Sequence, residues 1–366
     1  MKIALGVPCE LNHDKPNGFL TAFNTISSAL SDHNRVIFAP SGGDINLTIN
    51  QLDTADLANQ YNNSIALSKA FAKEVSKINP DRILAFTNMG LFLDGDYIYY
   101  TSNMPYRKVL ELVKDEYPDT PNFNKLLDYY RFIAEKEKAN YKKADKIIVL
   151  SRKIEQSLIE DHEINPQKIR YIPRPVPKIN ILNKQKTESR MRIILMPAEM
   201  RVMKGIRYAI ETMKIVKKEV PEAVLMICGR INNYEQDHIR QLLNEAKGKA
   251  NIMPLGFLPK NTLYNYMRNA ECAFMPFVFD ECPIALSECI ANSLPVVTNE
   301  YAGFDREVIN EFGICAKYKD TEDYARDLIK ILTDKNLNKR KREGCSSVAE
   351  KFTFSRFKKE VNDVFN

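Results

Sequence analysis

The chain is poor in the residues that build metal centres and disulfide frameworks. It has 366 residues, no tryptophan and only four histidines, which are scattered along the sequence. None of its seven cysteines forms a Cys-x-x-Cys pair, and several fall in apolar runs. We therefore expect reduced thiols rather than disulfides, and no metal site built from histidine or cysteine.

Long apolar runs and a strong charge imbalance are also missing. No stretch approaches the roughly 18 apolar residues of a membrane span, and the N-terminus has a strand pattern instead of a signal peptide. The net charge is +6, with 23 basic and 22 acidic residues at 1–180 and 30 and 25 in the remainder. A strongly basic face for nucleic acid is not expected. These features predict a cytoplasmic protein and leave open peripheral contact with the inner face of a membrane.

The sequence is instead rich in strand patterns that alternate with helix patterns. Strands are predicted at 2–7, 36–40, 83–88, 97–101, 147–150 and 169–172 in the first half, with Ser151 as a helix N-cap. This alternation over 366 residues predicts an α/β protein with two doubly wound parallel sheets that face a cleft. The predicted boundaries are a first domain at 1–176, a linker at 177–190, a second domain at 191–350 and a C-terminal helix within 351–366.

Residues 276–298 have the pattern strand, turn, helix, strand, with Asp280 in the turn and Glu288 in the helix. Pro283 suits the first helical position, so the amides of Ile284, Ala285 and Leu286 would lie at the positive end of the helix dipole and suit a phosphate. Carboxylates accept hydrogen bonds from sugar hydroxyls. The alternative is that both acidic residues only complement the helix dipole.

A second basic motif lies at 193–206, where an apolar strand is followed by a loop with Arg201 and Lys204 and then by a helix. Arginine grips phosphate oxygens with a fork of donors and lysine supplies a mobile charge, so the two side chains could neutralise a diphosphate. They could equally be two solvated surface charges.

Two glycines are placed where a backbone must turn or approach a ligand. Gly229 ends the continuous apolar strand 223–230, where it either admits a ligand or makes a turn. Gly18 opens the amphipathic helix 17–30 after the first strand, and Asn17 before it could be a simple N-cap.

In Asp280, Glu288 and the following Pro-Val-Val at 295–297, the chain resembles the retaining glycosyltransferases of the GT-B fold, of the family-4 type (group 1). The signature of that family is an acidic residue, seven others, a glutamate, a helix of small residues and a Pro-Val-Val strand. The sequence departs from it at Asp280, where glutamate is usual, at 281–283, where Glu-Cys-Pro replaces a Gly-Phe-Gly turn, and at Glu199, where arginine is usual.

The resemblance implies a role for each of these sites. A UDP- or GDP-sugar would bind the second domain, with Asp280 on the sugar hydroxyls and Glu288 on the ribose. Lys204 and Arg201, with the amides at 284–286, would stabilise the departing diphosphate. The base would lie near Gly229 and the segment 256–259, which contains Phe257 and Leu258. The final helix would pack back on the first domain.

In the first domain the resemblance places three residues, Asn17, Gly18 and Phe19, near the transferred sugar and the acceptor. Asn103 lies in a loop where many relatives carry a histidine. The acceptor, a glycan, a lipid-linked molecule or a small molecule, would be recognised by the predicted loops 8–19, 41–62 and 102–125. No cofactor and no divalent metal would be obligatory. Two alternatives remain, an epimerase or phosphorylase on the same fold and a catalytically silent nucleotide-sugar-binding subunit.

Overall fold

The computed structural model describes residues 1–11, 18–47, 57–94, 96–101, 104–179, 191–233, 235–280 and 282–366. The chain divides into two compact units. Unit 1 is Met1–Pro173 with Phe354–Asn366, and unit 2 is Arg174–Thr353. Most of the predicted linker, residues 180–190, lies outside the described residues.

Unit 1 is built on one parallel sheet with strand order β3-β2-β1-β4-β5-β6-β7. Its strands are β1 (Lys2–Gly6), β2 (Asn34–Ala39), β3 (Ile45–Asn46), β4 (Arg82–Phe86), β5 (Ile98–Thr101), β6 (Lys146–Val149) and β7 (Ile169–Tyr171). Its helices are α1 (Gly18–Ala29), α2 (Leu57–Ile78), α3 (Tyr106–Val113), α4 (Pro121–Lys143), α5 (Arg152–Glu160) and α13 (Phe354–Phe365), with short 3-10 turns η1 (Thr87–Gly90) and η2 (Pro166–Lys168). The terminal helix α13 bonds to α1 through Asn362, whose amide donates to the carbonyl of Ala29.

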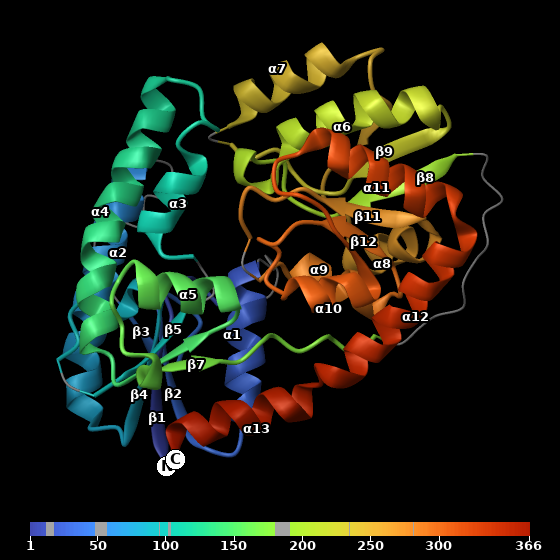
Figure 1. The fold of residues 1–366 in the computed structure, drawn as a ribbon. Coiled ribbons are helices and arrows are strands. Elements are labelled where there is room, and N and C mark those ends of the chain that lie inside the picture. Colours follow the sequence, from blue (N-terminus) through green and yellow to red (C-terminus); the bar gives the residue numbers. More distant parts are fainter. Residues whose placement is uncertain are drawn as a thin grey trace. The chain divides into compact units, whose positions relative to one another are not determined.

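Unit 2 repeats this architecture with a six-stranded parallel sheet of order β10-β9-β8-β11-β12-β13. Its strands are β8 (Arg192–Met196), β9 (Ala223–Ile227), β10 (Ile252–Pro254), β11 (Cys272–Met275), β12 (Val296–Thr298) and β13 (Gly313–Cys315). Its helices are η3 (Val202–Lys204), α6 (Ile206–Glu219), α7 (Gln236–Ala246), α8 (Lys260–Asn269), α9 (Ile284–Ala291), α10 (Arg306–Phe312), α11 (Thr321–Thr333) and α12 (Lys335–Lys351). Figure 1 shows α6, α7 and α11 on one face of the sheet and α8, α9 and α10 on the other. The predicted class, two Rossmann-like α/β domains with parallel sheets, is confirmed.

Several local predictions can be compared with the structure. The hydroxyl of Ser151 accepts a hydrogen bond from the amide of Ile154 at 3.1 Å, so the predicted N-cap is confirmed. The prediction of a loop over 102–125 is wrong, because this stretch contains α3 and the start of α4. Helix α3 buries Val109, Leu112 and Val113, and this helical spacing of apolar residues was the missed signal.

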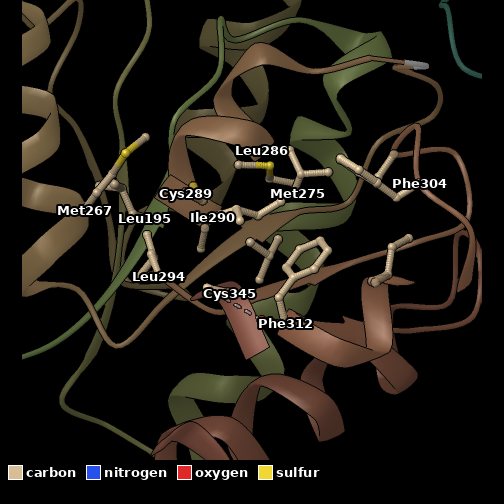
Figure 2. Packing of buried hydrophobic residues seen from close by; sticks show 14 of the residues in the cluster. Leu195, Met267, Met275, Leu286, Cys289, Ile290, Leu294, Phe304, Phe312 and Cys345 are labelled. Atoms are coloured by element: carbon tan, nitrogen blue, oxygen red, sulfur yellow. Dashed lines mark hydrogen bonds between the residues drawn. The ribbon is translucent and has the colours of Figure 1, made fainter. Parts of the chain in front are cut away.

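The core of unit 2 fixes the position of α9. Leu286, Cys289 and Ile290 are buried side chains of α9 and belong to the same cluster as Met275 of β11 and Cys345 of α12 (Figure 2). Burial of this face sets the rotation of the helix, and with it the direction of every other side chain on α9. All seven cysteines have free thiols, as predicted. Within the described ranges, no helix has the length and hydropathy needed to span a bilayer.

Candidate active site

The strand order of unit 2 defines a topological switch point between β8 and β11. From β8 the chain proceeds outward to β9 and β10, then returns to β11 on the other side, which pairs with β8 at Ala273 and Leu195. In open parallel sheets of this kind, ligands bind in the crevice outside the carboxyl ends of the strands at the switch point. Here the two loops concerned are 197–205 and 276–283, which contain the predicted Lys204 and Asp280.

Lys204 and Asp280 meet at this switch point. The Nζ of Lys204 forms an ion pair with Oδ2 of Asp280, and both side chains are about one-fifth exposed, at 22% and 19%. The same ammonium lies 5.5 Å from the ring centroid of Phe277, a distance at which an aromatic face attracts a cation. A cation and a carboxylate thus lie side by side in a partly buried place. An ammonium group can bind a phosphate, and a carboxylate can accept hydrogen bonds from sugar hydroxyls.

Gly205 allows the two loops to touch. Its φ is 78°, in the left-handed region, and an added Cβ would overlap the carbonyl oxygen of Pro276. Next to this contact, the amide of Val278 donates to the carbonyl of Met203 at 3.0 Å. Only glycine combines this backbone conformation with such a close approach. Gly205 therefore lets the first loop lie close to the second, and this contact brings the neighbouring Lys204 within reach of Asp280.

Asn299, a residue that the sequence reasoning missed, fixes the loop that carries Asp280. Its fully buried side chain donates to the carbonyl of Phe277 at 2.7 Å and accepts from the amide of Tyr301 at 2.9 Å. The carbonyl of Tyr301 in turn accepts from the amide of Asp280 at 3.0 Å. The available signal was a polar residue directly after the buried strand β12.

Helix α9 starts at Ile284, so Pro283 is its N-cap residue. The sequence pattern had placed Pro283 at the first helical position, one residue too early for the start of the helix. The amide of Leu286 donates to the carbonyl of Pro283 at 3.1 Å, so it is not among the amides that lack an acceptor within the turn. This corrects the sequence interpretation for Leu286. Ile284 and Ala285 are half-buried and occupy the first two helical positions, where no intrahelical acceptor exists.

Glu288 lies in the second turn of α9 and is buried, with its side chain 6% exposed. Its Oε1 pairs with Nζ of Lys260 and accepts a hydrogen bond from the hydroxyl of Tyr264 at 3.2 Å. Burial lowers the pKa of Lys260. Lys260 and Tyr264 were missed, although Lys260 directly follows the segment 256–259. Asp280 and Glu288 thus pair with two different lysines, Lys204 and Lys260.

Arg201 lies between two carboxylates. Its NH1 is 3.7 Å from Oε2 of Glu199, and its Nε is 3.6 Å from Oε1 of Glu235. Glu235 is almost fully buried and its Oε2 accepts from the amide of Val202 at 2.5 Å. Burial raises the pKa of Glu235, and the charge of Arg201 and the Val202 amide oppose that rise. Glu235 was not found from the sequence.

Gly229 is required by a close backbone contact. An added Cβ there would overlap the carbonyl oxygen of Ala198, in the loop after β8. Beyond it, the guanidinium of Arg230 lies 4.9 Å from the ring centroid of Phe257, which is 54% exposed. Leu258 is half-buried against the core of unit 2. Gly229 thus brings the ends of β8 and β9 together, and the ring of Phe257, beside Arg230, is more than half exposed.

The candidates of the first domain are less well defined. Asn17 and Asn103 lie outside the described residues, and Gly18 is the first residue of α1. The side chain of Phe19 is not among those described. Their assignment to the acceptor remains a prediction. In the part of the chain that the structure describes, no group of three or more histidine, cysteine, aspartate or glutamate side chains is arranged to hold a metal ion.

The chain is similar in sequence to known glycosyltransferases. Residues 178–347 match the family of glycosyl transferases group 1. An uncharacterized glycosyltransferase of Methanocaldococcus jannaschii is 26% identical over 195 residues, 51% of this chain and 48% of that protein. The chain thus spans about half the length of this curated relative.

Solved structures match over nearly the whole chain. WaaG, a glycosyltransferase involved in lipopolysaccharide biosynthesis, has a TM-score of 0.77 at 17% identity, covering 100% of this chain and 99% of that one. HepE of Anabaena in complex with UDP-glucose has a TM-score of 0.68 at 12% identity, covering 99% and 98%. The fold is therefore GT-B. In agreement with the resemblance drawn from Asp280, Glu288 and residues 295–297, the second half of the chain is similar to glycosyl transferases of group 1.

Proposed function

We propose that this protein is a retaining glycosyltransferase of the family-4 type. It would move a hexosyl group from a UDP- or GDP-sugar to an acceptor hydroxyl. The observation that carries the proposal is the pairing of Lys204 with Asp280 at the switch point of unit 2. A cation for phosphate and a carboxylate for sugar hydroxyls lie together there, beside the N-terminus of α9.

In this proposal the donor replaces the Lys204–Asp280 ion pair. The diphosphate takes Lys204 and the amides of Ile284 and Ala285, while the sugar hydroxyls take Asp280. The acceptor oxygen attacks the anomeric carbon as the bond from that carbon to the diphosphate oxygen breaks. The departing phosphate accepts the proton of the acceptor on the same face, which retains the configuration. Lys204 and the helix amides lower the barrier by stabilising the growing negative charge.

The nucleotide occupies the other end of the same site. Glu288 binds the ribose hydroxyls, and Lys260 and Tyr264 hold its carboxylate until the donor arrives. The base lies against the exposed ring of Phe257, near Gly229 and Leu258. Support for a uridine donor comes from the GT-B neighbour HepE, whose structure was solved in complex with UDP-glucose.

Positive protein groups supply the charge that a metal would otherwise provide, so we propose that no divalent ion is obligatory. The acceptor is a glycan, a lipid-linked molecule or a small molecule bound by unit 1. A role in polysaccharide or glycoconjugate synthesis, in the cytoplasm or at the inner face of the membrane, fits this chemistry.

The test is release of nucleoside diphosphate from a panel of UDP- and GDP-sugars, with and without candidate acceptors. Lys204→Ala should lower the rate by roughly 10²- to 10³-fold, as expected for loss of one group that stabilises transition-state charge. The matched control is Lys214→Ala, which breaks an exposed ion pair with Glu211 on the surface of α6 and should leave the rate unchanged. Full activity in Lys204→Ala would refute the assignment. Donor binding without release in the wild type would favour a silent binding subunit.

A further inference from the structure

The two carboxylates beside Arg201 differ in how firmly the protein holds them. Glu235 faces the Nε edge of the guanidinium and has a side chain that is 1% exposed. Glu199 faces the NH1 end and is 43% exposed. The guanidinium therefore has one partner inside the protein and one at its surface, on the loop that also carries Lys204.

Glu235 is fixed by more than Arg201. It is the N-cap residue of α7, its carbonyl accepts from the amide of Ile239 at 2.9 Å, and its Oε2 accepts from the amide of Val202 at 2.5 Å. A buried carboxylate without a neighbouring cation is strongly destabilising. The buried Glu235 therefore stabilises the position of Arg201 in which the Nε edge of the guanidinium lies beside it.

The side chain of Glu199 is more exposed than that of Glu235, and it has a second hydrogen-bonding partner besides Arg201. The side-chain amide of Asn232 donates to its Oε1 at 3.2 Å. Asn232 itself is anchored, because its backbone amide donates to the carbonyl of Met200 at 3.2 Å. Glu199 can thus leave Arg201 and keep a hydrogen bond. Carboxylate and phosphate oxygens present the same acceptor geometry to a guanidinium, so either can occupy its NH1 end.

We propose that Glu199 is a resident anion: it occupies the position on Arg201 that a phosphate of the nucleotide takes, while Glu235 is a positioning residue that holds Arg201 in place. This inference rests on the proposed function, since it assumes that a nucleoside diphosphate binds at the loop of Lys204. Binding exchanges Glu199 for phosphate, and on release Glu199 returns. The glutamate that departs from the family pattern at 199 is thus a built-in competitor of the donor.

The test measures the affinity of UDP and GDP by calorimetry for the wild type, Glu199→Gln, Arg201→Ala and the double variant. Glu199→Gln removes the competing charge and should tighten binding about 3- to 10-fold. The gain should vanish in the Arg201→Ala background, because the competition acts through the guanidinium. The matched control is Glu222→Gln, which removes an exposed carboxylate 3.3 Å from Arg192 and should not alter affinity.

A second variant tests the anchor. Glu235→Gln keeps an oxygen that can accept from the Val202 amide but lacks the charge that holds Arg201, so affinity should fall, by about tenfold. Substitution of the two glutamates that contact Arg201 should thus change the nucleotide affinity in opposite directions. If both residues had only a structural role, neither substitution should tighten binding. If the wild type binds neither UDP nor GDP, the proposed function fails and this inference with it. If it binds one of them but Glu199→Gln is no tighter, or its gain persists without Arg201, the inference alone is overturned.

Discussion

Glu137 gives unit 1 a stability that depends on pH. This residue of α4 is 3% exposed, and its Oε2 accepts a hydrogen bond from the amide of Tyr106 at 2.8 Å, at the start of α3. Burial raises the pKa of Glu137 from 4.5 to about 8, although the Tyr106 hydrogen bond opposes the rise. The folded protein therefore keeps this carboxyl protonated at pH values where the unfolded chain has lost the proton.

The direction and size of the effect follow from that difference. Between pH 4.5 and pH 8 the folded state binds one more proton than the unfolded state at this site, so the free energy of unfolding falls as pH rises. The slope is about 1.4 kcal/mol per pH unit, which over the interval amounts to about 5 kcal/mol. Glutamine has the same shape, carries no charge and can still accept from Tyr106. Glu137→Gln should thus match the wild type near pH 4.5 and exceed it by several kcal/mol at pH 8.

The assay is urea unfolding of wild type and Glu137→Gln at each pH unit from 5 to 8, followed by tyrosine fluorescence, because the chain has no tryptophan. Comparison at each pH cancels the contribution of unit 2. The control is Glu135→Gln, an exposed residue of the same helix, whose difference from wild type should stay constant. A Glu137→Gln difference that does not grow with pH would refute the reasoning.

Two further outcomes are expected. Gly205→Ala should lower the free energy of unfolding by more than about 2 kcal/mol, because a side chain is strained at this left-handed φ and would overlap the Pro276 carbonyl; an unchanged urea midpoint would show that the two loops do not meet as described. If the proposed function holds, removal of divalent ions with EDTA should leave the rate of sugar transfer unchanged, because Lys204 and Arg201 would carry the compensating charge; a loss of rate that Mg²⁺ restores would contradict that role.

The order of elements could be predicted from the sequence because local periodicity determines it. Strand-helix alternation indicated both parallel sheets, and the predictions for Asp280, Lys204 and Glu288 rested on their places after strands or within a helix. The prediction failed where the periodic pattern is short. Helix α3 was assigned to a loop, since its eight residues carry only a short apolar pattern.

The side-chain partners within the site could not be predicted. Lys204 and Asp280 were expected to share a ligand, yet 76 positions separate them and their direct pairing depends on the backbone contact at Gly205. Lys260 reaches Glu288 across 28 positions, from a helix whose rotation is set by packing. Such pairings follow from sheet order and buried faces, which no single segment of sequence specifies.

The measurement that tests the central claim most directly is thermal stabilisation by a panel of UDP-, GDP-, ADP- and dTDP-sugars without added metal. A ligand that binds only the folded state at 100 times its dissociation constant adds about 2.7 kcal/mol to the free energy of unfolding. We predict a selective rise in melting temperature with one UDP- or GDP-sugar, lost in Glu288→Ala and kept in Glu219→Ala, an exposed residue at the end of α6. No shift with any of these sugars, or an equal shift in Glu288→Ala, would contradict a nucleotide-sugar site at α9.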